Sequence, residues 1–208
     1  MKYYPAFLNL KDKKAVVAGG GKVAERKALS LVNAGAAVKV ISPDITENLR
    51  KLKKKGLIKH IKRNYREGDL KDAFIVVAGT SSAEINAKIA QEAPHLVNVI
   101  DLPSAGNYVV PSIVRRGPLA IAISTEGVSP AVSKAVRKEI ERLYGREFAL
   151  YLKFVGLIRK EAREKITNCK KREKFLKSLA SEELFTAVRN RGFSTAYKKI
   201  VSSLNDMQ

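Results

Sequence analysis

Apolar and amphipathic stretches alternate through the first half of the chain. Residues 15–18 are all apolar, which predicts a buried strand, and three consecutive glycines follow at 19–21. Beyond the glycines, apolar residues recur at helical spacing until Gly35, which predicts a helix that ends there. The next apolar run, at 37–41, predicts a second strand. This order of strand, helix and strand is typical of a βαβ unit.

The same alternation continues to residue 100. Strands that alternate with helices in this way favour a parallel sheet with both faces covered. We therefore predict an α/β fold in which residues 1–111 form a Rossmann-type domain. Its further elements are expected to be a helix at 46–54, a weak strand at 58–61, a buried strand at 74–78, a helix at 82–93 and a strand at 97–100.

The pattern then changes to that of an antiparallel hairpin. Two runs rich in β-forming residues, 108–114 and 119–124, are separated by only four residues. Ser129 and Pro130 are typical of the start of a helix, and the remaining sequence is helical in character. We divide this part of the chain into a hairpin and helix segment, 112–147, and a small helical C-terminal domain, 148–208.

The glycines carry the clearest chemical signal. The sequence from Gly19 to Ala24 fits the dinucleotide-binding pattern G-x-G-x-x-G/A. Gly19 allows a tight turn, Gly21 lets the backbone approach a pyrophosphate, and Ala24 stands where the helix packs on the strand. Backbone amides at the start of that helix would face the phosphates. Because the pattern follows a strand and opens a helix, we predict a bound dinucleotide.

The end of the second strand bears on the choice between NAD and NADP. A carboxylate there usually binds the ribose of NAD. In this chain the position falls near Ile41 or Ser42, and the nearest acid is Asp44. No Arg follows immediately to hold the 2′-phosphate of NADP, which favours NAD without deciding the question.

Two other places in the sequence are candidates for binding or catalysis. Asp101 follows the strand predicted at 97–100, and ligands of open α/β sheets lie beyond the carboxyl ends of the strands. Its carboxylate is a candidate for proton transfer, and it is equally well explained as a cap of the loop that follows. Ser124 and Thr125 close the second hairpin strand, where they either bind substrate or satisfy turn amides.

Composition limits the kind of partner. The 208-residue chain has 40 Lys and Arg against 20 Asp and Glu, and its net charge of +20 favours a negatively charged ligand. No apolar run is long enough to cross a membrane, and polar residues begin too early for a secretory signal, so we expect a cytoplasmic protein without membrane contact. The basic residues of the helical tail either contact carboxylates or keep that domain soluble: Arg159, Arg163, Arg172 and Lys174.

Other features have simpler explanations. Four lysines between residues 51 and 55 lack interleaved aromatic residues, which is typical of a solvated helix face, so no nucleic-acid partner is expected. His60 and His95 do not form a ligand pair by their spacing, so no metal site is expected. Cys169 is the single cysteine, which excludes disulfide frameworks and cysteine-based zinc sites.

Five blocks of sequence stand out when the chain is considered as a whole. They are Tyr4-Pro5-Ala6-Phe7-Leu8-Asn9-Leu10, Gly19-Gly20-Gly21-Lys22-Val23-Ala24-Glu25-Arg26-Lys27-Ala28, Asn98-Val99-Ile100-Asp101, Val110-Pro111-Ser112-Ile113 and Ser124-Thr125-Glu126-Gly127-Val128-Ser129-Pro130. In this order and spacing the chain resembles the precorrin-2 dehydrogenases of sirohaem synthesis, including the amino-terminal part of the bifunctional and trifunctional sirohaem synthases. Beyond residue 150 only a helical, basic character is shared.

The resemblance implies an NAD-dependent oxidation of precorrin-2 to sirohydrochlorin by a homodimer whose interface involves 112–147. A hydride passes to NAD while an inner proton is lost, and an aspartate whose pKa is raised by burial can accept that proton. The net positive charge would steer this polycarboxylate substrate toward the protein. The implied roles are the essential aspartate for Asp101, NAD contacts for Lys22, Val23, Pro43 and Asp44, and a place in the tetrapyrrole pocket for Ser124 or Thr125.

Three alternatives stay open. Some members of the family also insert iron into the product, for which the obvious proton acceptors here are Asp101, His60 and His95. A non-catalytic NAD sensor would bind the dinucleotide without turnover and would have no use for Asp101. A nucleic-acid binder would show an affinity that falls steeply with salt.

Overall fold

The computed structural model describes residues 3–205 of the chain. The fold separates into two compact units, Met1–Val110 and Pro111–Gln208. Each unit has its own buried core, so each is described by itself.

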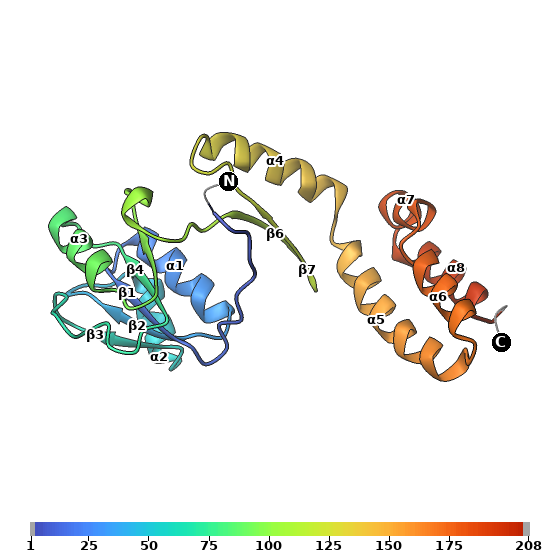
Figure 1. Ribbon diagram of the computed structural model, residues 1–208, viewed down its shortest axis with the longest axis horizontal. Helices are drawn as coiled ribbons and strands as arrows, with labels where there is room; N and C mark the ends of the chain where they lie inside the picture. The colour runs from blue at the N-terminus through green and yellow to red at the C-terminus, as the bar shows by residue number, and fades with distance from the viewer. Residues whose placement is uncertain (1–2, 206–208) are drawn as a thin grey trace. The chain divides into compact units, whose positions relative to one another are not determined.

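The first unit is a five-stranded parallel sheet with the strand order β3-β2-β1-β4-β5 (Figure 1). The order reverses at β1, whose two neighbours are β2 and β4. Ligands of such sheets bind beyond the carboxyl ends of the strands at this reversal. Along the chain the elements are β1 (Lys14–Ala18), α1 (Lys22–Asn33), β2 (Ala37–Ile41), α2 (Glu47–Lys54), β3 (Ile58–Ile61), β4 (Ile75–Ala78), α3 (Ala83–Glu92), β5 (Leu96–Val99) and the short 3-10 helix η1 (Pro103–Ala105).

Helices cover both faces of this sheet. Because side chains alternate along a strand, Ala15 and Val17 of β1 pack in the core that contains residues of α1 and α2, whereas Val16 and Ala18 pack in the core that contains residues of α3. All four are at most 2% exposed, so the strand is buried on both faces. This is why β1 is a continuous apolar run in the sequence.

Local signals fix where the helices begin and end. Thr46 caps α2 by accepting from the Leu49 amide at 3.3 Å, and Ser82 caps α3 by accepting from the Ile85 amide at 3.2 Å. The chain leaves α1 through Gly35, whose φ of +82° is the left-handed conformation that glycine adopts without strain.

The second unit begins with a hairpin of β6 (Ser112–Arg116) and β7 (Leu119–Ile123), followed by α4 (Pro130–Leu143). The first hairpin strand was predicted at 108–114, which is wrong for residues 108–111. The backbone amides of Asn107 and Tyr108 donate to the Val97 carbonyl, and the Asn98 side chain donates to the Tyr108 carbonyl at 3.1 Å. Residue 108 is therefore attached to the parallel sheet, and the hairpin starts after Pro111, which has no amide to donate.

Four helices complete the second unit, and aromatic side chains fill their core. Phe148 packs edge-to-face on Tyr144 and Phe185 with ring centroids 5.0 and 5.7 Å apart. The buried Tyr151 hydroxyl donates to the Leu179 carbonyl, which joins two of the helical segments. The helices are α5 (Glu147–Lys165), α6 (Cys169–Ser178), α7 (Glu182–Arg191) and α8 (Phe193–Asn205).

The predicted fold class is confirmed: a Rossmann-type parallel sheet is followed by a hairpin and a helical C-terminal part. The proposed separation of 112–147 from 148–208 stays a prediction. Among residues 3–205, no helix is both long and apolar enough to cross a membrane.

Candidate functional site

A cleft of about 730 Å³ lies at the carboxyl edge of the parallel sheet. Segments that follow all five strands line it, so it occupies the position at which open α/β sheets bind ligands. The predicted residues Gly19, Gly21, Lys22, Val23, Pro43, Asp44 and Asp101 all line this cleft.

Close backbone contacts between loops form the floor of the cleft. A Cβ atom on Gly19 would lie 2.1 Å from the Gly79 carbonyl oxygen, and one on Gly20 would lie 1.9 Å from the Asp44 carbonyl oxygen. Gly19 also has a φ of +121°. Glycine is therefore required at both positions, because the loops after β1, β2 and β4 touch there.

Gly21 differs from its two neighbours, because a Cβ atom on it would meet nothing within 4 Å. It caps α1 with extended backbone and no side-chain cap, so the first amides of that helix have no intrahelical acceptor. The open space and these amides fit a pyrophosphate, which binds to N–H groups and to the positive end of the helix dipole.

The segment after β2 forms the ribose end of the cleft. Ser42 is 9% exposed, and its carbonyl accepts a hydrogen bond of 2.9 Å from Nε2 of His60 on β3. The side chain of Asp44 is exposed and lines the cleft. Asp44 is thus an exposed carboxylate at this end of the cleft, and its contact with a ribose hydroxyl stays a prediction.

The loop after β4 and the start of α3 contain side chains that sequence analysis missed. The buried Asn86 accepts from the Thr80 amide at 3.0 Å and donates to the Thr80 carbonyl at 3.1 Å. Ser82 caps the same helix, and both Thr80 and Ser82 line the cleft. An asparagine one turn into a predicted helix, such as Asn86 in α3, is the sequence signal that could have indicated hydrogen bonds to the preceding loop.

Tyr65 is a second lining residue that the sequence did not reveal. Its hydroxyl donates to a carboxylate oxygen of Glu92, and burial together with this bond raises the pKa of Tyr65. Arg63 and Asp69 form a bidentate ion pair in which both N···O distances are 2.6 Å. The pair holds the segment after β3, and the Arg63 hydrogen bonds lower the pKa of Asp69.

Asp101 lies beyond the end of β5 in a turn, with a φ of +67°. The preceding residue is fixed to the sheet, because the Ile100 amide donates to the Ala78 carbonyl at 2.8 Å. The Asp101 carboxylate is exposed and has no hydrogen bond or ion pair within residues 3–205, so the loop-capping explanation finds no contact there. The expectation that this carboxyl is buried is wrong for the chain as folded here.

Ser124 and Thr125 belong to the second unit. The Ser124 hydroxyl accepts from the Glu126 amide at 3.1 Å, and the Thr125 hydroxyl bonds with the Ser129 amide and carbonyl at 3.2 and 3.1 Å. Both hydroxyls therefore satisfy the turn before α4. Their role in substrate binding stays a prediction.

The histidines and acids of the described residues do not gather into a set of three that could hold a metal ion. His60 is hydrogen-bonded to Ser42, and the ring of His95 lies 6.1 Å from that of Phe74. The two histidines thus have separate structural surroundings on different strands and loops.

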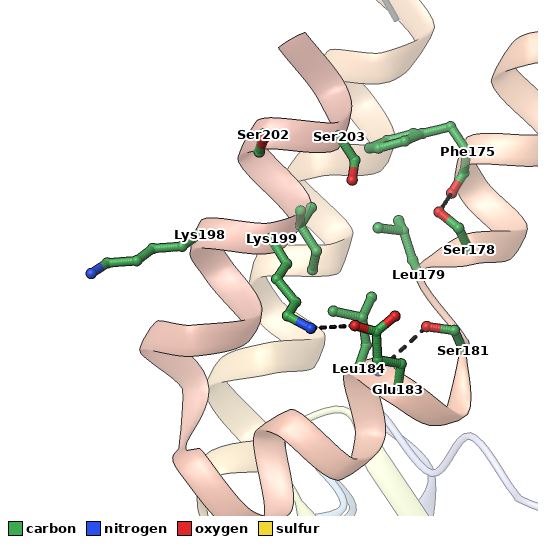
Figure 2. Close-up of a pocket in the computed structure, with 11 residues that line it drawn as sticks. Phe175, Ser178, Leu179, Ser181, Glu183, Leu184, Lys198, Lys199, Ser202 and Ser203 are labelled. Carbon is green, nitrogen blue, oxygen red and sulfur yellow. Dashed lines mark hydrogen bonds and ion pairs between the residues drawn. The ribbon is translucent and has the colours of Figure 1, made fainter. Parts of the chain in front are cut away.

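A second hollow, of about 560 Å³, lies among α6, α7 and α8 (Figure 2). Several of its polar groups have partners within the helices: Glu183 pairs with Lys199, and Ser181 accepts from the Leu184 amide. The Ser178 hydroxyl donates to the Phe175 carbonyl at 2.7 Å. Because these bonds occupy the Glu183 carboxylate and the Ser178 and Ser181 hydroxyls, these three groups serve the helices themselves.

The part of the chain that contains the cleft is similar to known dinucleotide-binding proteins. Residues 6–112, half of the chain, match the family model described as "Putative NAD(P)-binding". The chain belongs to this NAD(P)-binding family. Residues 116–143 also match the model of the sirohaem biosynthesis protein central region. The dinucleotide predicted from the glycine loop is confirmed at the level of NAD(P).

Named relatives of this NAD(P)-binding chain point the same way. It is 31% identical over 207 residues to "Siroheme synthase 3" of Aeromonas hydrophila, covering 98% of this chain and 44% of the relative. It is 34% identical over 192 residues to "Siroheme synthase" of Nitrosococcus oceani, covering 89% of this chain and 41% of the relative. The chain thus spans less than half the length of these relatives. Their names confirm the resemblance drawn from the sequence motifs.

A solved structure shares the fold of both units. The structure of "SirC, precorrin-2 dehydrogenase" matches with a TM-score of 0.81 and 24% identity, over 96% of this chain and 100% of that one. The match supports the order of sheet, hairpin and helical part described above.

Proposed function

We propose that the chain oxidises precorrin-2 to sirohydrochlorin with NAD as the hydride acceptor. The observation that carries this proposal is the cleft, which combines a glycine loop at the start of α1 with the exposed carboxylate of Asp101. Siroheme synthases and a precorrin-2 dehydrogenase among the similar proteins support the choice of substrate.

The chain's own residues bind and orient the dinucleotide. The amides at the start of α1 would bind the pyrophosphate, and Asp44 would bind the ribose hydroxyls, with Lys22, Val23 and Pro43 as neighbouring contacts. Bound NAD supplies a hydride acceptor. Asn86 and the Arg63–Asp69 pair fix the loops after β4 and β3, so the walls of the cleft are ordered before binding.

Asp101 is the proposed proton acceptor. Oxidation of precorrin-2 removes a hydride and a proton, and an exposed carboxylate without an ion pair among residues 3–205 can accept the proton. Its place beyond β5 puts it on the wall of the cleft that also contains the glycine loop. The net charge of +20 would draw a polycarboxylate substrate toward this cleft.

We also propose that the chain is a homodimer through the segment 112–147. Within residues 3–205 the hairpin sheet contains only β6 and β7, so one edge of each strand is unpaired. Leu119, Ile121 and Ile123 are only half-buried, and an apolar edge strand is a template for pairing with a second chain. Ser124 and Thr125 directly follow β7, and we propose that they contact the tetrapyrrole. We also propose that the protein is cytoplasmic.

The test is anaerobic incubation of the protein with precorrin-2 and NAD, monitored by NADH formation and by the product spectrum. We expect Asp101→Ala to reduce the oxidation rate about 100-fold, the typical contribution of a general base, and to leave NAD affinity within about twofold. Asp12→Ala is the matched control, because Asp12 is another exposed aspartate with a positive φ, of 60°. Near-normal turnover by Asp101→Ala would remove this residue from the mechanism.

The same assay separates the alternatives. If NAD binds but neither NADH nor sirohydrochlorin forms, a non-catalytic NAD sensor would be the better explanation. Addition of ferrous iron tests chelation, because a shift of the spectrum to sirohaem above the uncatalysed rate would add iron insertion to the activity.

A further inference from the structure

A basic pocket of about 390 Å³ adjoins the ribose end of the cleft. Pro43, Asp44 and Ile45 line both cavities, so the two are adjacent and share these residues. The other residues that line the pocket are Arg50, Lys53, Lys54, His60 and Lys62.

The charges of this pocket are mostly unneutralised. Lys53, Lys54 and Lys62 are exposed and have no ion pair within residues 3–205, and Asp44 is the only acid that lines the pocket. Arg50 pairs with Glu47 at 3.2 Å, a surface pair that water screens. The pocket therefore keeps a net positive charge.

Two elements, α2 and β3, and the segment after β3 bring these side chains together. Lys53 and Lys54 belong to the last turn of α2, His60 to β3, and Lys62 follows that strand. His60 Nε2 donates to the Ser42 carbonyl, which leaves Nδ1 as the free ring nitrogen. Sequence analysis sought a single Arg directly after β2 and did not anticipate a set assembled by the packing of α2 beside β3.

We propose that this pocket binds the 2′-phosphate of NADP, so that the chain accepts NADP as well as NAD. The inference rests on the proposed function, in which a dinucleotide occupies the cleft with its adenosine ribose near Asp44. A phosphate monoester on that ribose would extend from the cleft toward the cations of the pocket. Lysines bind phosphate as point charges, and several of them offset the repulsion from one carboxylate.

Binding measured without precorrin-2 tests this proposal separately from catalysis. NAD and NADP are titrated by calorimetry at low ionic strength into the unaltered protein and into the double variant Lys53→Gln with Lys62→Gln. We expect the double variant to weaken NADP about tenfold, equivalent to about 1.4 kcal/mol, and to change NAD affinity less than about twofold. The matched control, Lys51→Gln with Lys55→Gln, removes two lysines from the same region that do not line the pocket and should leave both affinities unchanged.

A second variant addresses the opposing charge. Asp44→Asn should strengthen NADP binding and weaken NAD binding, because the carboxylate repels a phosphate and accepts from ribose hydroxyls. Adenosine 2′,5′-bisphosphate should compete with NADP far better than inorganic phosphate at the same concentration, because only the nucleotide is also bound by the cleft.

Three results would overturn the proposal: equal losses of NAD and NADP affinity in the double variant, no loss of NADP affinity in that variant, or equal competition by inorganic phosphate. Equal competition by inorganic phosphate would mean that the pocket binds anions in general and does not recognise the nucleotide. If neither dinucleotide binds the unaltered protein, the proposed function fails and the inference fails with it. If both bind but precorrin-2 is not oxidised, only the proposed function fails.

Discussion

The parallel sheet and the helical bundle of this chain both contain a cavity, and the two cavities are built differently. In the sheet, the cleft is bounded by glycine backbone, free helix amides and exposed carboxylates. In the bundle, the hollow between α6, α7 and α8 is lined by side chains, among them the Glu183–Lys199 ion pair and serine hydroxyls that bond to the helix backbone. The cleft thus presents backbone amides and carboxylates at the edge of a parallel sheet, whereas the hollow presents side chains of packed helices, and the sheet edge is where α/β folds bind ligands.

The largest effect is expected in the bundle. Phe175 is fully buried in the aromatic and aliphatic core of the second unit. Phe175→Ala should lower the free energy of unfolding by about 4 kcal/mol because it leaves a cavity. Since the dinucleotide cleft lies wholly within the other unit, NAD affinity should stay within about twofold. Denaturant unfolding and calorimetry measure the two quantities.

The control for this prediction is Leu157→Ala, because Leu157 is 65% exposed on α5 and should cost about 0.5 kcal/mol or less. A loss of NAD binding in Phe175→Ala would show that the cleft depends on the bundle and would contradict the separation drawn here.

A smaller effect is expected in the sheet unit at Asp69. Asp69 pairs with Arg63, and their side chains are 11% and 33% exposed, respectively. Asp69→Asn removes the negative charge from this pair, so it should lower the free energy of unfolding by about 2 kcal/mol at pH 7. Asp72→Asn is the matched control, because Asp72 pairs with Lys14 at the surface, where an ion pair contributes about 0.5 kcal/mol.

The effect of Asp69 should depend on pH in a defined direction. The pKa of Asp69 is lowered in the folded protein, chiefly by its hydrogen bonds with Arg63. A group with a lowered folded pKa stabilises the protein above its unfolded pKa and loses that contribution as the pH falls through its folded pKa. The difference between wild type and Asp69→Asn should therefore shrink below about pH 4. A difference that stays constant down to pH 2 would rule out this electrostatic origin.

The smallest effect on stability is expected at Gly21. Since a Cβ atom there meets nothing within 4 Å and the backbone is extended, Gly21→Val should change the free energy of unfolding by about 0.5 kcal/mol or less. The side chain would occupy the space assigned to the pyrophosphate, so NAD binding should be lost. Gly156→Val makes the same change in equally open space on α5 and should leave NAD binding intact. Unchanged NAD affinity in Gly21→Val would refute the placement of the pyrophosphate.

The sequence predicted the sheet well where the signal is local. Strands β2 and β3 were predicted to the residue, β2 from a largely apolar run bounded by turn residues and β3 from a weaker pattern with an isoleucine at each end. The start of the hairpin was misplaced, because Tyr108 has the sequence character of a strand but is held by hydrogen bonds to β5. Its environment depends on residues that are distant in sequence from the hairpin.

The candidate site was predicted in the same uneven way. The glycine loop and Asp101, which the sequence singled out by a motif and a strand end, line the cleft, and their roles there stay predictions. Thr80, Asn86 and Tyr65 were missed, since their importance comes from hydrogen bonds that only the tertiary fold creates. The burial expected at Asp101 failed for the same reason, because exposure is not encoded in the residues next to it.

The contact between Gly19 and Gly79 also has a consequence for folding kinetics. It joins the ends of β1 and β4, two strands separated by α1, β2, α2 and β3 along the chain. Contacts of such long sequence separation close large loops and form only when the sheet itself forms. A partly folded chain with helices but no β1–β4 pairing has no cleft. The dinucleotide therefore binds only the completed sheet, and by mass action its cellular concentration adds to the lifetime of the native state.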